Sequence, residues 1–191
     1  MKKTSLFLIL LIVIAFMVTA CGGGKAPVNQ EPAKSSDKVE EKGNQEEPKP
    51  QVFQEMTSSI TTIDGWEKDE DVPSNVTFYK KDGFSVMLSR DRMPEEANTP
   101  EKFLEYVQET YRDSFSNVEF HDTAEIGVSD PDKHFLVYTY KIMNMELKGW
   151  NTYIFHDKYA YTLGCGGSSK DFPTVEEDFR TFIESFELVE K

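Results

Sequence analysis

Cysteine and histidine are both scarce in this sequence, and their scarcity excludes several kinds of chemistry. Cys21 and Cys165 are the two cysteines among 191 residues, too few for a disulfide framework. The three histidines include no pair four residues apart and have no cysteine partner, so they predict no zinc site. The Gly-x-Ser-x-Gly pattern of a nucleophile elbow is also missing. The sequence therefore offers no recognisable catalytic or metal-binding motif.

Basic residues are too few to balance the acidic ones. Lysine and arginine total 21 against 34 aspartate and glutamate residues, which gives a formal net charge of −13. A surface of this sign repels phosphate backbones and anionic lipids, so nucleic acid is not expected as a partner, whereas cationic partners are attracted diffusely. Two acidic turns, Asp69-Glu70-Asp71 and Asp130-Pro131-Asp132, could offer oxygens to calcium. Neither has EF-hand spacing, and ordinary turn chemistry explains both.

No apolar run is long enough to span a membrane. The longest extends over thirteen residues, from Leu6 to Val18, whereas a transmembrane helix needs roughly twenty. With Lys2 and Lys3 before it and small residues after it, the run is typical of a secretory signal peptide, which we place at residues 1–20. The alternatives are an uncleaved membrane anchor and a plain signal peptide that happens to precede a cysteine.

The four residues Val18-Thr19-Ala20-Cys21 resemble the lipobox of bacterial lipoproteins. In that family the cysteine thiol takes a diacylglycerol and becomes the mature N-terminus, so the resemblance implies lipid attachment at Cys21. Two acyl chains anchor a protein stably, whereas one chain holds it only marginally. Gly22 suits retention at the outer face of the plasma membrane, as the resemblance implies. We therefore expect a protein that is lipid-anchored on the extracytoplasmic face of the cell membrane.

Residues 21–50 are expected to form a disordered tether that begins at the lipidated cysteine. They are rich in Gly, Pro, Lys, Glu, Gln and Ser and contain few apolar residues, so they cannot bury enough surface to offset the entropy of ordering. A flexible chain of this length spans about 30 Å, and a fully stretched one about 95 Å. The folded domain is then predicted to comprise residues 51–191.

The predicted domain has strands on both sides of a first helix and a second helix near its end. Alternating apolar residues around Asp82-Gly83 predict a hairpin over residues 75–88. Thr99-Pro100 predicts a capped helix start, and a capping box at Thr174 and Glu177 predicts the start of the last helix. The apolar residues of this last helix fall at helical spacing and are expected to form its buried stripe: Val175, Phe179, Phe182, Ile183 and Phe186. Between the helices, strands are predicted over residues 118–128, 134–145, 148–155 and 159–165, the last three as an antiparallel meander.

The segment Phe179-Arg180-Thr181-Phe182-Ile183-Glu184-Ser185-Phe186, with the tyrosine-rich strand before it, resembles the C-terminal signature of PsbP-like domains. The order of elements agrees across residues 52–190. The resemblance implies the fold of the photosystem II extrinsic protein PsbP and of a Ran-binding nuclear import factor. That fold is an α+β fold, an α/β/α sandwich with a mainly antiparallel sheet and two main helices. The sequence departs from the pattern at Arg90-Asp91-Arg92-Met93-Pro94, which lacks the tryptophan that many relatives have there.

Four aromatic residues on one predicted hairpin, Trp150, Tyr153, Tyr159 and Tyr161, are the candidate binding residues. Tyrosine and tryptophan supply a large contact area at low entropic cost, so they could line a groove or a flat binding face. The alternative is that they are core residues of the sandwich. Cys165 ends an apolar run without a His or Lys neighbour, so we expect a buried thiol. The glycine-rich residues 164–168 lack the Gly-Lys-Ser/Thr end of a phosphate loop and are interpreted as a flexible turn.

PsbP-like relatives mostly act as accessory proteins on larger complexes and share no catalytic residues. The resemblance therefore implies a non-enzymatic binding or assembly module that needs no cofactor. Its partners would be the membrane, through the N-terminal lipid, and another envelope protein. The tether would substitute local concentration for high affinity. The alternatives are a lipoprotein that binds a small molecule or an envelope polymer, and a hydrolase whose site the sequence does not reveal.

Overall fold

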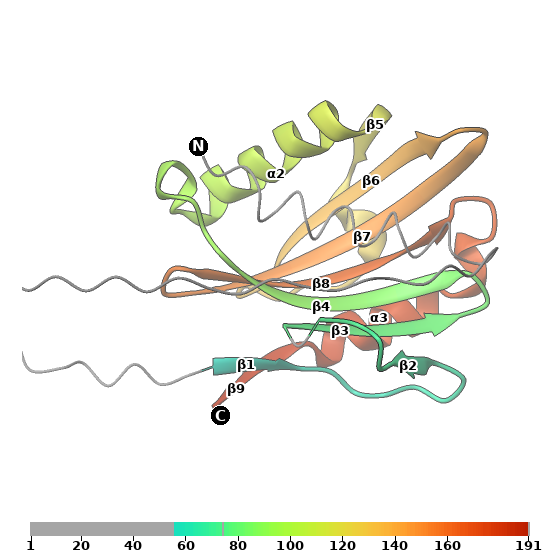
Figure 1. Cartoon of the computed structure of the whole chain (residues 1–191), viewed down its shortest axis with the longest axis horizontal. Coiled ribbons are helices and arrows are strands. Elements are labelled where there is room, and N and C mark those ends of the chain that lie inside the picture. The colour runs from blue at the N-terminus through green and yellow to red at the C-terminus, as the bar shows by residue number, and fades with distance from the viewer. Residues whose placement is uncertain (1–55, 74, 191) are drawn as a thin grey trace, which may run out of the picture. The chain divides into compact units, whose positions relative to one another are not determined.

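Seven antiparallel strands form the main sheet, in the order β2-β3-β4-β8-β7-β6-β5 (Figure 1). The structure is a computed structural model that describes residues 56–73 and 75–190, so the predicted signal peptide, Cys21 and the tether lie outside the described residues. The strands of this sheet are β2 (Glu67–Asp69), β3 (Val76–Lys81), β4 (Phe84–Arg92), β5 (Ser116–His121), β6 (His134–Ile142), β7 (Met145–His156) and β8 (Tyr159–Ser168). Two further strands, β1 (Met56–Ser59) and β9 (Glu187–Glu190), pair with each other as a separate ribbon.

Two α-helices cover opposite faces of the sheet: α2 (Pro100–Ser114) and α3 (Glu176–Ser185) (Figure 1). Side chains alternate between the two faces along a strand. Accordingly Trp150 of β7 contacts Phe179 of α3, whereas Tyr153 of the same strand contacts Phe103 of α2. The expected α+β fold, an α/β/α sandwich with an antiparallel sheet and two main helices, is therefore confirmed.

Three short 3₁₀-helices complete the described part of the chain, η1 (Glu95–Ala97), η2 (Thr123–Ile126) and η3 (Phe172–Thr174). The predicted helix start at Thr99 is confirmed, because the Thr99 side chain accepts a hydrogen bond from the amide of Lys102 and Pro100 is the first helical residue. Within residues 56–73 and 75–190, no helix combines the length and the apolar character that crossing a membrane requires.

The larger core lies between the sheet and α3. The apolar stripe predicted for this helix is buried throughout. Val175, just before the helix, is 4% exposed, and the other members are completely buried: Phe179, Phe182, Ile183 and Phe186. Trp150 packs against this stripe from the sheet and Trp66 from the segment before β2. Each indole N–H donates to a carboxylate, Trp66 to Asp178 at 2.9 Å and Trp150 to Glu125 at 2.7 Å. The two tryptophans therefore keep their polar atoms paired inside the core.

The start of α3 differs from the prediction. Thr174 lies in η3, and its hydroxyl donates to the carbonyl oxygen of Asp171 at 2.7 Å instead of capping α3. The residue before the first turn of α3 is Val175, whose side chain accepts no hydrogen bond. The predicted capping box at Thr174 and Glu177 is therefore wrong, because Thr174 belongs to η3 and its hydroxyl is hydrogen-bonded to Asp171.

The glycine-rich residues 164–168 are not a turn but the end of β8. A Cβ atom built on Gly167 would lie 2.3 Å from the ring of Phe84, so only glycine leaves room for that ring on the neighbouring strand. The predicted strand over residues 118–128 is also shorter than expected. It ends at His121, and η2 follows until Gly127, whose φ of 75° breaks the extended backbone.

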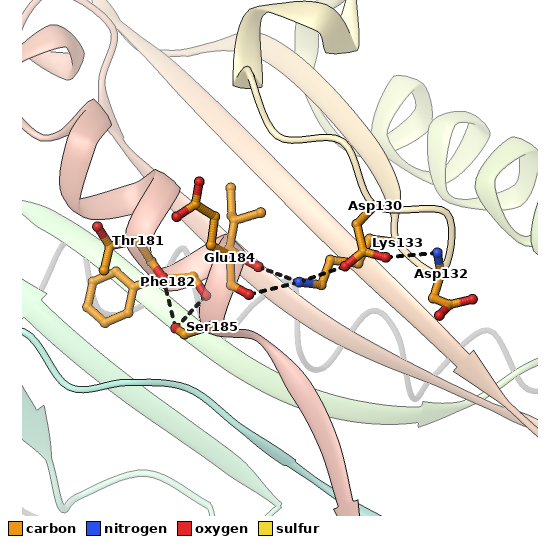
Figure 2. Close-up of polar contacts among 8 residues, drawn as sticks. Asp130, Asp132, Lys133, Thr181, Phe182, Glu184 and Ser185 are labelled. Atoms are coloured by element: carbon orange, nitrogen blue, oxygen red, sulfur yellow. Dashed lines mark hydrogen bonds and ion pairs between the residues drawn. The ribbon is translucent and has the colours of Figure 1, made fainter.

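Lys133 joins the C-terminal end of α3 to the loop before β6 (Figure 2). Its ammonium group donates to the carbonyl oxygens of Ile183 at 2.9 Å and Glu184 at 3.1 Å, and it pairs with the Asp130 carboxylate at 3.2 Å. The last carbonyls of a helix have no partner within the helix, and the helix dipole favours a cation beside them. Because the lysine side chain is only 7% exposed, water screens these contacts weakly.

We expect Lys133→Met to lower the free energy of unfolding by about 1–3 kcal/mol, because the α3 carbonyls and Asp130 lose their donor. Urea unfolding followed by circular dichroism measures this change. Lys170→Met, which alters an exposed lysine, is the control and should change the free energy by no more than about 0.5 kcal/mol. Equal stability of Lys133→Met and the wild type would contradict the role of Lys133.

Candidate functional site

The structure does not bring the four predicted aromatic residues together on one face. Trp150 and Tyr161 are buried on the α3 side of the sheet, and Tyr159 is partly buried against the same core. Tyr153 is buried on the opposite side, because it lies three residues after Trp150 along one strand. Three of the four therefore occupy the interior, the position that the core alternative predicts.

A buried asparagine organises the face beneath α2. The Asn151 amide donates to the hydroxyl groups of Tyr111 and Tyr153, both at 2.9 Å, and the Tyr138 hydroxyl donates to its oxygen at 3.4 Å. Burial raises the pKa of each of the three tyrosines. The ring of Tyr138 covers Gly149, where a Cβ atom would lie only 2.4 Å away. These polar groups satisfy one another, so the cluster fixes α2 on the sheet.

Asp91, near the end of β4, is a carboxyl group on this face that burial desolvates. Burial raises the pKa of Asp91, and the Ser89 hydroxyl donates to it at 3.2 Å. The two residues point to the same side of β4 because they are two positions apart. Their contact is local to one strand, and it does not assemble a catalytic pair.

Both acidic turns use their carboxylates within the fold. Asp130 accepts the amide N–H of Asp132 at 3.0 Å and pairs with Lys133 (Figure 2). Asp69 accepts the amide N–H of Asp71 at 3.0 Å and pairs with Lys80 at 2.6 Å. The hydrogen bond from Lys80 lowers the pKa of Asp69. The hydrogen bond from the amide of Asp132 lowers the pKa of Asp130. The turn interpretation thus accounts for both motifs.

No group of three or more histidine, cysteine, aspartate and glutamate side chains in residues 56–73 and 75–190 is arranged to hold a metal ion. Cys165 is a free cysteine and is 2% exposed, so the expectation of a buried thiol is confirmed. Burial raises the pKa of this thiol.

An exposed apolar turn joins β6 to β7. Its residues are Ile142-Met143-Asn144-Met145, which we call the methionine hairpin. Met143 is 87% exposed and Met145 is 56% exposed, and they are the two exposed large apolar side chains in the described part of the chain. Apolar side chains gathered on an otherwise polar surface mark interaction sites. Methionine is also common on surfaces that bind partners, because its side chain is flexible and polarisable.

The backbone of Met143 gives a second reason to single out this turn. Three hairpins of the sheet have two-residue turns, and the first turn residue has a positive φ in each: 50° at Asp82, 52° at Asp157 and 54° at Met143. Aspartate and asparagine tolerate this left-handed conformation through local hydrogen bonds, whereas it costs other side chains about 1–2 kcal/mol. Met143 is therefore exposed and has a strained backbone, at a position where the other two two-residue turns have aspartate.

The methionine hairpin continues an apolar strip along the α2 side of the sheet. Ile142 pairs with Met145, and the next pair on the same face is Tyr140 and Leu147, both buried. The ring of Phe115, which follows α2, lies 4.4 Å from that of Tyr140. In Figure 1 the β6–β7 turn projects beyond the end of α2, so the helix does not cover it.

Sequence reasoning places this turn too late, between the predicted strands 134–145 and 148–155, because the turn itself contains neither glycine nor proline. Residues 134–145 are so rich in β-formers that they were expected to be one strand, whereas the strand ends at Ile142 and the chain reverses at Met143 and Asn144. The only signal was Asn144, since asparagine is common in tight turns.

Comparisons with known proteins find similarity in solved structures alone, since no family model and no curated protein matches the chain. LpqN of Mycobacterium tuberculosis, involved in cell envelope biogenesis, is 8% identical with a TM-score of 0.53, over 72% of this chain and 86% of that one. A mutant of the protein Mog1 is 10% identical with a TM-score of 0.50, over 70% of this chain and 92% of that one. CyanoP, the cyanobacterial PsbP of Synechocystis sp. PCC 6803, is 12% identical with a TM-score of 0.44, over 74% of this chain and 96% of that one. At such identities the first two matches establish a shared fold.

Proposed function

We propose that the protein is a non-enzymatic binding module, held on the extracytoplasmic face of the cell membrane by a lipid on Cys21, which docks on another envelope protein through the methionine hairpin. The observation that carries the docking site is Met143, an apolar side chain that is 87% exposed at a strained turn position. Strain of this kind persists when the surrounding structure imposes it, and it gathers at functional positions. Folding alone gives no reason for methionine at this position.

The location is supported by the N-terminal sequence. Lys2 and Lys3, the apolar run and the lipobox-like residues 18–21 together favour export and lipid attachment. LpqN, a protein of the same fold, is involved in cell envelope biogenesis, which agrees with an envelope role here. Attachment through a diacylglycerol would keep the domain within reach of the same membrane, so a small contact surface would suffice for docking.

The charge of the chain favours a protein over the lipid surface as the partner of the methionine hairpin. The net charge is −13, and an anionic bilayer repels a protein of that sign. On α2, Glu101, Glu105 and Glu109 are exposed to solvent, whereas the hairpin itself has one ion pair at its base, Lys141 with Glu146 at 3.8 Å. These glutamates lie toward the start of α2, whereas the hairpin lies near Phe115, which follows the helix. The surface complementary to the hairpin itself is therefore an apolar pocket on a protein.

A photo-reactive amino acid placed at Asn144 of the full-length protein in living cells tests this proposal. We expect a discrete cross-linked envelope protein from position 144, identified by mass spectrometry. The same probe at Glu95, which is exposed just before α2, is the positional control and should not give that product. The same product from both positions, or cross-links from position 144 to lipid alone, would overturn the docking site.

The Cys21→Ser variant tests the contribution of the anchor in the same assay. It retains the methionine hairpin but cannot take a diacylglycerol, so the local concentration falls. We expect the cross-linked product to decrease at least about tenfold, since tethering raises apparent affinity by two or more orders of magnitude. An unchanged yield, with the variant still in the membrane fraction, would refute lipid attachment at Cys21.

A further inference from the structure

The five methionines of the described residues differ sharply in their access to solvent. Met143 and Met145 are 87% and 56% exposed, whereas Met93 is 7% exposed and Met56 and Met87 are partly buried. The methionine side chains with the greatest access to solvent are thus the two on the methionine hairpin. Cys165, the one cysteine among the described residues, is buried. Soluble oxidants therefore meet the hairpin sulfurs before other sulfur atoms of the described domain.

We infer that Met143 and Met145 are a modification site for two-electron oxidants of the peroxide class, and that their oxidation releases the docked partner. This inference rests on the proposed function of the methionine hairpin. In each event the thioether sulfur attacks one peroxide oxygen, an S–O bond forms and the O–O bond breaks. The sulfur is oxidised to a sulfoxide, and hydrogen peroxide is reduced to water.

The consequence follows from the place of the two side chains. A sulfoxide is polar, so the hairpin loses the apolar contact that would fill a partner's pocket. The fold is unaffected, because neither side chain belongs to the core of the domain. Oxidation of a buried methionine such as Met93 would instead introduce a polar group into packed surroundings and destabilise the domain. A reductase that returns two electrons to the sulfoxide restores the thioether and therefore docking.

The first test treats the purified full-length protein with hydrogen peroxide and follows each methionine by peptide mapping. We expect Met143 and Met145 to gain an oxygen atom at least about tenfold faster than Met93, as the solvent access of the thioethers dictates. The melting temperature should not change while only the hairpin is oxidised. Equal rates at Met93 and Met143, or unfolding that accompanies hairpin oxidation, would overturn the inference.

The second test measures cross-linking from position 144 after cells are exposed to peroxide. The wild-type yield should fall about tenfold, which corresponds to a loss of about 1.4 kcal/mol. The double variant Met143→Leu/Met145→Leu keeps apolar side chains but has no sulfur, so it should dock before and after treatment. Wild-type cross-linking that survives complete sulfoxide formation overturns this inference and leaves the docking proposal intact. Absence of the cross-link before any peroxide overturns the docking proposal itself, and this inference with it.

Discussion

Replacing Phe179 with alanine should lower the free energy of unfolding by about 3–5 kcal/mol, which is the usual cost of deleting a buried phenyl ring. Phe179 is completely buried in the middle of α3. Its ring lies 5.1 Å from that of Phe172, 5.7 Å from Trp66 and 6.2 Å from Phe84, so it joins the helix, η3 and the sheet. The loss combines the transfer energy of the ring with a cavity that these neighbours cannot collapse to fill.

Urea unfolding of the described domain measures this loss of stability. Two further variants serve as comparisons. Phe179→Leu keeps most of the volume and should cost less than about 1.5 kcal/mol, so it reports on packing even if the alanine variant does not fold. Tyr106→Ala removes a partly exposed ring on α2, and its cost should lie near the average of about 1 kcal/mol for point mutations. Similar losses for Phe179→Ala and Tyr106→Ala would show that the α3 core does not dominate stability.

The sequence predicts well the elements whose structure is determined by residues close together in the chain. The spacing of Phe179, Phe182, Ile183 and Phe186 predicts the buried face of α3, because helical periodicity alone places them together. Asp82-Gly83 predicts the β3–β4 turn, and the two residues have φ values of 50° and 83°, as such a two-residue turn requires. No information from distant residues is needed for either.

The elements that the sequence does not predict depend on distant partners. β9 is four residues long and exists as a strand because it pairs with β1, more than a hundred residues away. The sequence around Gly167 predicts a turn, whereas in the structure Gly167 is a strand residue that leaves room for the ring of Phe84 on the neighbouring strand. The polar cluster beneath α2 likewise requires Tyr111 of the helix to meet Asn151 of the sheet. Single-sequence patterns contain none of these pairings.

The candidate site was hidden for a related reason. Tryptophan and tyrosine supply a large contact area, so the sequence favours the aromatic residues as binding residues. In the structure Trp150 and Tyr153 lie on opposite faces of the sheet and are buried. Met143 looked like an ordinary strand residue. Its significance appears once the three turns of the sheet are compared, since Asp82 and Asp157 have the same backbone conformation.

The double variant Met143→Asn/Met145→Thr should separate stability from docking. Asparagine tolerates a positive φ, so relief of strain should raise the free energy of unfolding by about 0.5–1 kcal/mol. Threonine is a strong β-former and suits the first position of β7. Loss of both apolar side chains should reduce cross-linking from position 144 at least about tenfold. A variant that is more stable but docks less well indicates that the methionines are retained for function and not for stability.

Asp157→Met is the matched control for that variant, because Asp157 occupies the equivalent position in the β7–β8 turn. It should lower the free energy of unfolding by about 1–2 kcal/mol through the same backbone strain. It should leave docking unchanged, since successive turns of an antiparallel meander lie at opposite ends of the sheet. Unaltered cross-linking by the Met143→Asn/Met145→Thr protein would refute the docking surface. Equal losses in that protein and in Asp157→Met would mean that turn stability, and not the methionine side chains, governs the contact.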